Sequence, residues 1–395
     1  MKEISRIAAA VQASTTLQVD ALFKQMKADG KNVVGFGAGE PDFNTPENIS
    51  EAAHKAIRDG QTKYTPVAGI PALKQAVVDR LQADCGISYA PGQIVAASGA
   101  KHNIYIALQA LVNPGDEVIV PAPYWVTYTE AVKMAGGVPV VITATEADDF
   151  KITASQLDAA VTDKTKLFIL NNPSNPTGML YSADELKALA DVCLKHDLYV
   201  ISDEIYYKLL YDGKKFTSFA SLGEDIKERT IIVNGVSKTY AMTGWRIGYT
   251  ASSSKLAEVM SNYLSHATSA PSTISQIAAV EALNGPQEGI EEMRKVFEQR
   301  RDYIYDRINA IPGVSCRKPD GAFYVMMNIE KLIGRTLGGV EIRNSDDFSL
   351  SFLENGLVAL VSCSGFGIDN FLRLTYASSM EEIKEGMDRL EKFVK

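Results

Sequence analysis

A lysine that follows an apolar run is the residue of this sequence with the most direct catalytic potential. Lys238 comes a few residues after the apolar run 230–234, and Arg246 lies further along the chain. Burial and nearby cations both lower the pKa of a lysine, and only the neutral amine can form an imine with an aldehyde. An isolated lysine more often lies on the surface, so Lys238 is a candidate nucleophile only if other functional residues lie beside it.

Two further polar residues follow apolar runs in the same way. Asp203 ends the run 198–203, and Asn175 lies in the loop 171–178, NNPSNPTG, directly after another run. Open parallel sheets bind ligands at the carboxyl ends of their strands, and a carboxylate placed there needs a cation or hydrogen-bond donors. We therefore expect Asp203 and Asn175 to face a ligand; a helix N-cap and a plain turn are the alternative roles.

Three other features extend this site. The segment 98–101 joins a predicted strand to a predicted helix, and amides at a helix N-terminus bind phosphate well, although many such turns hold no ligand. Trp125 can stack on a flat ligand or fill the core. Arg373 lies between leucines, where it can bind a carboxylate ligand or form a structural ion pair. Together with Tyr206, which closely follows Asp203, these residues supply a lysine, a carboxylate, an aromatic ring, an asparagine, a tyrosine and a phosphate site, which describe a pocket for pyridoxal phosphate.

Composition and charge narrow the classes of function. The chain has 395 residues and a net charge of −8, from 40 Lys and Arg against 48 Asp and Glu, whereas proteins that coat nucleic acid or acidic membranes usually have the opposite sign. The 4 cysteines are scattered, so we expect reduced thiols and no metal site. No apolar run reaches the roughly 18 residues of a membrane helix. We therefore predict a cytoplasmic protein without nucleic-acid or membrane partners.

The residues of this site must be positioned by a sheet. Apolar runs without polar alternation are typical of strands that are covered on both faces, and amphipathic segments of helical periodicity lie between them. Strand and helix in alternation favour an α/β fold with a mostly parallel, seven-stranded central sheet flanked by helices. The predicted strands are 94–98, 117–121, 138–142, 167–171, 198–203, 230–234 and 246–251. The predicted helices between them are 101–111, 124–135, 183–196 and 255–265.

The last third of the chain has a different pattern. A long charged helix is predicted near 287–311, and short strands and a final helix follow, which indicates a second, smaller α+β domain. Gly285-Pro286 is a plausible hinge. We expect a large domain of residues 47–286 and a discontinuous small domain of residues 1–46 and 287–395. The later elements are the strands 322–328, 358–361 and 371–375 and the helix 379–394.

Eight motifs in order along the chain carry a resemblance to a known family. They are GAGEPDFNTP (37–46), KYTPVAGIPALK (63–74), PGDEVIVPAPYWVTY (114–128), NNPSNPTG (171–178), SDEIY (202–206), SKTYAMTGWRIGY (237–249), GAFYV (321–325) and RLTYA (373–377). The sequence resembles the fold-type I aminotransferases of class I, and among them the bacterial type of aspartate aminotransferase. The combination of SKTYAMTGWRIGY with NPTG and SDEIY is highly specific.

The resemblance implies pyridoxal 5'-phosphate as cofactor and a role for each matching position. Lys238 would hold the cofactor as an imine and then move the substrate proton, and Asp203 would pair with the pyridine nitrogen. Asn175 and Tyr206 would hydrogen-bond the phenolic oxygen, and Trp125 would stack on the ring. The phosphate would lie among Gly99, Ala100, Lys101, Ser237 and Arg246, with Tyr64 reaching it from the other subunit of a homodimer. The Ala122-Pro123 and Asn175-Pro176 peptides would be cis.

The resemblance also implies a mode of substrate binding. Arg373 would bind the α-carboxylate with help from Gly39 and Asn175, next to Trp125. Lys101 matches the lysine that the bacterial type uses for the distal carboxylate, and Ser14 and Thr16 match small polar residues on that side. Ala13 departs from the family, where proline is common, which puts the closing of the N-terminal segment over substrate in doubt. We therefore expect a ping-pong exchange between aspartate and 2-oxoglutarate.

Other functions fit parts of the same pattern. An aminotransferase for aromatic amino acids, alanine or prephenate, or a β-eliminating C–S lyase, would share the fold and most of these motifs. A pyridoxal-phosphate sensor domain of a transcription regulator would need a DNA-binding domain before the motif at 37–46. An α/β binding protein without cofactor would give a colourless protein that gains no near-visible absorption with pyridoxal phosphate.

Overall fold

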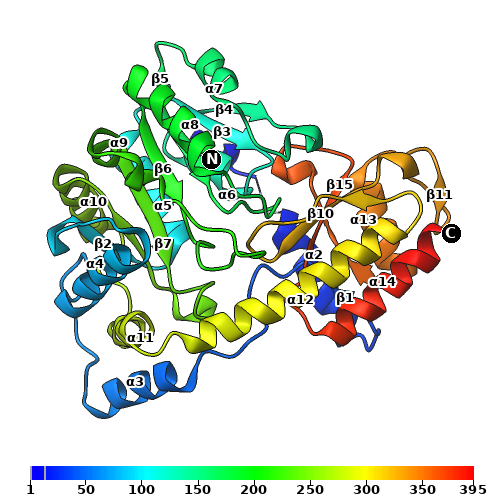
Figure 1. Cartoon of the computed structure of the whole chain (residues 1–395), viewed down its shortest axis with the longest axis horizontal. Helices are drawn as coiled ribbons and strands as arrows, with labels where there is room; N and C mark the ends of the chain where they lie inside the picture. The colour runs from blue at the N-terminus through cyan, green and yellow to red at the C-terminus, as the bar shows by residue number, and fades with distance from the viewer. Residues whose placement is uncertain (1, 13–14) are drawn as a thin grey trace.

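The computed structural model describes residues 2–12 and 15–395, without the side chains of residues 15–20. A seven-stranded sheet lies at the centre of the larger part of the chain (Figure 1), in the strand order β2-β8-β7-β6-β5-β3-β4. Its strands are β2 (Ile94–Ala97), β3 (Glu117–Ala122), β4 (Val138–Thr143), β5 (Thr165–Asn171), β6 (Tyr199–Asp203), β7 (Thr230–Gly235) and β8 (Gly248–Ala251). All seven predicted strands are therefore present and belong to one sheet.

The sheet is mostly parallel, as predicted. Only β8 runs against its two neighbours, β7 and β2. The prediction placed the start of this strand at Arg246, but the strand begins at Gly248. Arg246 has a left-handed backbone conformation, with a φ of 57°, and ends the short 3-10 turn Thr243–Trp245. Residues 243–246 therefore belong to a turn, and β8 begins only after it.

Helices cover both faces of the sheet because successive strand residues point to opposite sides. On β5, Leu167 and Ile169 pack into the core beneath α5, α6 and α10, whereas Phe168 and Leu170 pack into the core beneath α7 and α8. The helices of this part are α3 (Glu47–Arg58), α4 (Pro71–Cys85), α5 (Ala100–Leu111), α6 (Thr127–Met134), α7 (Ala154–Ala160), α8 (Ala183–Lys195), α9 (Glu224–Arg229), α10 (Ser254–Ala267) and α11 (Thr273–Asn284). Helix α6 is shorter than the predicted helix 124–135, since it begins at Thr127 and ends at Met134.

The last third of the chain forms a separate antiparallel sheet with its own helices. The sheet order is β14-β15-β10-β9, and β11 pairs with β12. The strands are β9 (Ser315–Cys316), β10 (Tyr324–Asn328), β11 (Thr336–Leu337), β12 (Val340–Glu341), β13 (Val358–Ala359), β14 (Val361–Ser362) and β15 (Phe371–Thr375), and the helices are α12 (Glu288–Ala310), α13 (Ser345–Gly356) and α14 (Met380–Val394). The predicted strand 358–361 is two strands, because β13 leaves this sheet to pair with β1 (Val34–Gly35).

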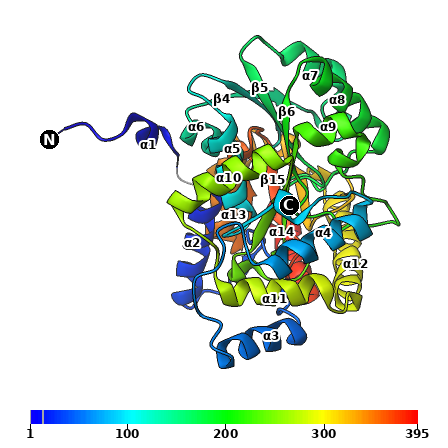
Figure 2. The ribbon, with the colours of Figure 1, turned by 90° about the vertical axis from the view of Figure 1, so that its left-hand side faces the viewer.

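The N-terminal segment lies partly against the last third of the chain and partly outside the body of the molecule. The strand β1 pairs in parallel with β13, so this early part of the chain lies with the last third. The helix α2 (Thr15–Ala28) packs beside the same region. Figure 2 shows α1 (Arg6–Ala10) projecting from the body of the molecule, and Ile4 and Ile7 on this projection are 77% and 51% exposed. Among the described residues, no helix combines the length and apolar character needed to cross a membrane.

Candidate active site

Strand register gathers the predicted residues at one edge of the central sheet. Asn171 at the end of β5 is paired with Asp203 at the end of β6, and Asp203 is paired with Val233 of β7. Because β7 ends at Gly235, Lys238 follows at the same edge. A cavity of about 570 Å³ opens there. Its lining includes Phe23, Lys24, Gly37, Ala38, Gly39, Glu40, Ala100, Lys101, Trp125, Tyr128, Asn171, Asn175, Asp203, Ile205, Tyr206, Ser237, Lys238, Thr243, Arg246, Tyr324 and Arg373.

Asp203 is a buried carboxylate whose hydrogen-bond partners are neutral. Its Oδ2 accepts a hydrogen bond of 2.7 Å from the Tyr128 hydroxyl, and its Oδ1 accepts one of 3.2 Å from the Ile205 amide. Only 3% of the residue is exposed. Burial raises the pKa of Asp203 to about 6, although these hydrogen bonds and the Lys238 charge oppose the rise. A cationic ligand group beside it would restore its ionised form.

Lys238 has the lowered pKa that an imine-forming lysine needs. The side chain lies half-buried at the cavity wall and donates a hydrogen bond to the Gly39 carbonyl. Burial is the main cause that lowers the pKa of Lys238 to about 8, and the charges of Arg373 and Arg246 lower it further, against the opposing charges of Glu40 and Asp203. A substantial fraction of its amine is therefore neutral near pH 8.

The start of α5 and Arg246 form a cationic corner of the cavity. Gly99 precedes the helix with a φ of 89°, and a Cβ built on it would lie 2.6 Å from Nη2 of Arg246. The Arg246 guanidinium donates to the carbonyls of Thr243 at 3.0 Å and Ser98 at 3.3 Å. Burial and the charge of Arg246 lower the pKa of Lys101. Helix amides and two cations at one place suit a phosphate.

Arg373 lies between two aromatic rings, and one of its hydrogen-bond donors has no partner in the described part of the chain. Its guanidinium carbon is 4.5 Å from the ring centre of Tyr324 and 5.2 Å from that of Phe366. Nη1 donates to Oδ1 of Asn175 at 3.2 Å and Nη2 to the Gly37 carbonyl at 2.8 Å. Nε is buried and makes no hydrogen bond within the described part of the chain. Because both partners are neutral oxygens, the structural ion pair considered above is not what holds Arg373.

Aromatic residues form the remaining walls. The Lys101 ammonium lies 4.8 Å from the ring centre of Trp125, so both residues line one side of the cavity. The Tyr206 hydroxyl is 3.1 Å from the Tyr324 hydroxyl. Burial raises the pKa of Tyr206 well above its ordinary value, and the neighbouring Tyr324 adds to the rise. Both phenols are therefore neutral hydrogen-bonding groups at ordinary pH.

Most predicted site residues line this cavity; of the described ones, Gly99 and Tyr64 do not. Gly99 lies behind the lining, against Arg246. Tyr64 is fully exposed and lies outside the cavity of its own chain. Ser14 and the side chain of Thr16 fall outside the described residues. The peptides Ala122-Pro123 and Asn175-Pro176 are cis as expected, and Asn172-Pro173 is a third cis peptide that was not predicted.

Sequence reasoning missed several residues that shape the site. Tyr128 and Tyr324 hold predicted residues from distant positions, Asn171 accepts the Asn175 amide at 2.7 Å, and Glu40 accepts from Thr243 at 2.7 Å. Tyr128 follows Trp125 by one helical turn, and Tyr324 lies inside the GAFYV motif, so the motifs held a signal for both. Neither residue lies at the end of a predicted apolar strand, where Asp203, Asn175 and Lys238 were expected.

Comparison with known proteins identifies the family. Residues 31–390 match the class I and II aminotransferases. The chain belongs to this family. An aspartate aminotransferase from Bacillus sp. (strain YM-2) is 49% identical, with 97% of this chain and 96% of that protein covered. An aspartate/prephenate aminotransferase from Cereibacter sphaeroides is 44% identical, with 100% and 99% covered. The crystal structure of the aspartate aminotransferase from Rhizobium meliloti superposes with a TM-score of 0.96 at 41% identity, covering 100% of this chain and 99% of that one. The predicted aminotransferase fold and activity class are therefore confirmed.

Proposed function

We propose that this aminotransferase uses pyridoxal phosphate to exchange the amino group between aspartate and 2-oxoglutarate. One observation carries the proposal: a half-buried lysine with a pKa of about 8, a buried carboxylate and a buried arginine with an unpaired Nε line the same cavity. These groups suit, in turn, an aldehyde, a protonated ring nitrogen and a substrate carboxylate. The names of the similar proteins support the same activity.

The residues of the cavity fit pyridoxal phosphate on structural grounds. Asp203 is ionised only at a cost while its hydrogen-bond partners are neutral, and a protonated pyridine nitrogen would offset that cost. Gly99 keeps open the space between the start of α5 and Arg246, which a Cβ would fill. When bound, this cofactor supplies an electron sink for the bond that breaks at the substrate Cα.

The protein's own residues bind and orient the substrate and move its proton. Arg373 binds the α-carboxylate through its free donor, and Asn175 and Tyr324 hold the guanidinium in place. Lys238 would hold the cofactor and, once its amine is free, would accept the proton from the substrate Cα and return it to the cofactor carbon that bears the substrate nitrogen. A pKa of about 8 suits both directions of this transfer, because the amine exchanges protons readily near neutral pH.

The preference for aspartate rests on Lys101. This residue and Arg373 line the same cavity, and the Lys101 ammonium lies beside Trp125. Two cations that flank one cavity suit a dicarboxylic acid, whose charges they neutralise at both ends. We assign Lys101 to the distal carboxylate; Ser14 and the side chain of Thr16, expected to take part in the same contact, fall outside the described residues.

Replacing Lys101 tests the substrate. In Lys101→Ser we expect kcat/KM for aspartate to fall roughly tenfold to a hundredfold, since a hydrogen bond to a charged group contributes about 1.5–3 kcal/mol. Alanine and phenylalanine lack a distal carboxylate, so any fall in their rates measures the loss of cofactor binding alone, and the rate for aspartate should fall further than theirs. Unaltered aspartate kinetics would make the substrate assignment wrong.

A panel of substrates separates the remaining candidates. Faster turnover of phenylalanine, alanine or prephenate than of aspartate would favour the related aminotransferases, and one similar protein is named for both aspartate and prephenate. Release of a thiol from a cysteine conjugate would indicate a β-eliminating lyase. A colourless protein that gains no near-visible absorption with pyridoxal phosphate would indicate a binding protein.

We propose that the active form is a homodimer. Tyr64 is fully exposed and does not line the cavity of its own chain, which suits a residue that completes the phosphate site of a second copy. The projecting segment that contains α1 would offer the exposed side chains of Ile4 and Ile7 to the same partner (Figure 2). We also propose that residues 1–46 and 287–395 close together over the substrate, and that the protein acts in the cytoplasm.

A further inference from the structure

Two segments that shape the active site are joined behind it. The loop that contains Asn175 ends at Gly178, whose carbonyl accepts hydrogen bonds from the amides of Asp320 at 2.9 Å and Gly321 at 2.8 Å. From Gly321 the chain continues directly into β10, which begins at Tyr324. Any movement of residues 320–321 therefore reaches both Asn175 and Tyr324.

A third segment, which follows Tyr206, meets the other two at the same place. The Leu209 carbonyl accepts the Ala322 amide at 2.9 Å, and the Tyr211 amide donates to the Asp320 carbonyl at 3.0 Å. The Tyr211 hydroxyl also donates to the Ala322 carbonyl. The segments 175–178, 206–212 and 319–324 thus form one hydrogen-bonded unit behind the cavity wall.

Arg301 of α12 ties this unit together from outside the active site. Its side chain is fully buried, at 0% exposure, and its guanidinium stacks 4.9 Å from the ring centre of Tyr211. Two parallel hydrogen bonds join its Nη1 and Nη2 to the Asp212 carboxylate, at 2.8 Å and 3.0 Å. Nη1 also donates to the Pro319 carbonyl at 2.8 Å. One side chain therefore contacts both the segment after Tyr206 and the segment before Tyr324.

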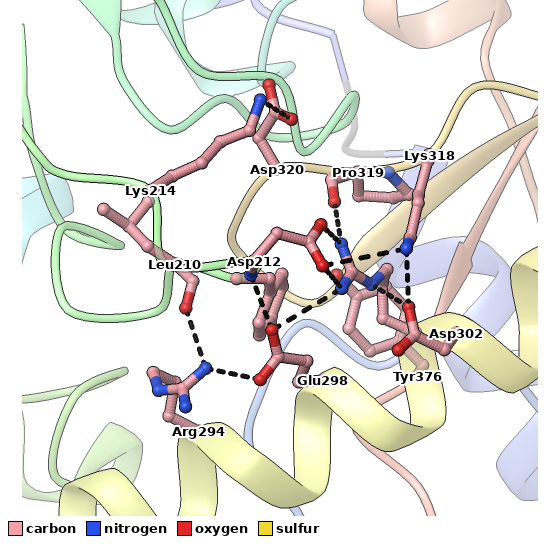
Figure 3. A network of polar contacts seen from close by, with 12 residues as sticks. Leu210, Asp212, Lys214, Arg294, Glu298, Asp302, Lys318, Pro319, Asp320 and Tyr376 are labelled. Atoms are coloured by element: carbon pink, nitrogen blue, oxygen red, sulfur yellow. Dashed lines mark hydrogen bonds and ion pairs between the residues drawn. The ribbon is translucent and has the colours of Figure 1, made fainter.

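Further charges surround this contact, as Figure 3 shows. The Glu298 carboxylate accepts the Asp212 amide at 2.6 Å, and Arg294 donates to the Leu210 carbonyl at 3.1 Å. Lys318 lies 3.1 Å from the Asp302 carboxylate. Arg294, Glu298 and Asp302 come from α12, so one long helix of the last third fixes segments that reach the cofactor side of the site.

We propose that Arg301 is a positioning residue of the transaminase site: by clamping Asp212 and Pro319, it fixes where Tyr206, Tyr324 and Asn175 stand. Arg301 is not among the residues that line the cavity, so it acts through these residues. The inference rests on the proposed function for its kinetic part. The role requires the planar, forked guanidinium, because a lysine ammonium is a single point of charge that lacks the two parallel N–H groups with which Arg301 holds the Asp212 carboxylate.

The test compares two clamp variants with a matched control. Arg301→Lys keeps the charge and loses the fork, and Asp212→Asn weakens the clamp at a side chain that is 45% exposed, so it remains informative if Arg301→Lys does not fold. The control is Arg307→Lys, on the same helix. Arg307 pairs with Asp388 at 2.8 Å and Glu391 at 3.3 Å on α14, away from the unit. Two measurements are made: hydrogen exchange of the cofactor-free proteins, and kcat and KM of the loaded ones.

We expect the amides of Gly321 and Ala322 to exchange at least about tenfold faster in both clamp variants, because their hydrogen bonds open more often. We also expect kcat/KM for aspartate to fall roughly tenfold to a hundredfold, since small displacements of substrate-binding groups have effects of this size. In Arg307→Lys both quantities should stay as in the unsubstituted protein. A fall in melting temperature shared by Arg301→Lys and Arg307→Lys, without these changes, would overturn the positioning role. Absence of transamination in the unsubstituted protein would instead overturn the proposed function.

Discussion

At the scale of single residues, the buried carboxylate of Asp203 lowers the free energy of unfolding at neutral pH. Burial raises the pKa of Asp203 from its ordinary value of 3.8 to about 6. The folded protein therefore binds more protons than the unfolded chain between pH 4 and pH 6, and the free energy of unfolding falls as pH rises through that window. A carboxylate that destabilises the empty protein at neutral pH is best explained by the cation it receives from a ligand.

Asp203→Asn separates these two effects. We expect the cofactor-free variant to be more stable than the unsubstituted protein at pH 7, by at most roughly 3 kcal/mol, and to lose the stability change between pH 4 and pH 6. Its affinity for pyridoxal phosphate should fall. Urea unfolding at several pH values measures the first effect, and titration with cofactor measures the second. A variant that is less stable at pH 7, relative to the exposed control Asp59→Asn, would contradict the argument.

At the scale of elements, the sequence predicted the sheet and the residues at its edge, because the apolar runs end where polar side chains of the cavity begin. Lys238, Asp203 and Asn175 were found by that rule. Tyr128 and Tyr324 were not, because they meet Asp203 and Tyr206 across 75 and 118 residues of sequence. Contacts of this kind are set by how α6 and β10 pack against the sheet, and no local pattern reports such packing.

The start of α5 gives a prediction at the same scale. Gly99 and Gly115 both have a φ of 89°, but a Cβ would meet Arg246 only at Gly99 and would meet nothing within 4 Å at Gly115. Alanine at either position strains the backbone by about 1–3 kcal/mol. Gly99→Ala should in addition weaken pyridoxal phosphate binding roughly tenfold to a hundredfold by displacing a charged donor. Equal cofactor affinities in Gly99→Ala and Gly115→Ala, measured by titration, would show that Arg246 does not bind the phosphate.

At the scale of the whole molecule, the net charge of −8 conceals a cationic cavity. Lys101, Lys238, Arg246 and Arg373 line one cavity at the edge of the sheet. In the proposed homodimer, the exposed Tyr64 would complete the cavity of the second copy. A site shared between two copies would make the activity depend on how the copies are combined.

Mixed dimers test this sharing. Tyr64→Ala leaves Lys238 in its own chain, and Lys238→Ala leaves Tyr64 to complete the partner's site. When the two variants are unfolded, mixed and refolded at limiting pyridoxal phosphate, we expect more activity than the sum of the two refolded separately, because a mixed dimer contains one intact site. Activity that stays at that sum, with dimers confirmed by sedimentation, would place Tyr64 outside the site.

The central claim is that Lys238 carries out transamination of aspartate, and product formation in a single half-reaction tests it most directly. The protein loaded with pyridoxal phosphate is mixed with aspartate alone, and oxaloacetate is counted; 2-oxoglutarate is then added, and glutamate is counted. The account predicts one oxaloacetate and then one glutamate per subunit, and neither product from Lys238→Ala on the same timescale. Oxaloacetate from Lys238→Ala at the rate of the unsubstituted protein, or no oxaloacetate from either, would contradict it.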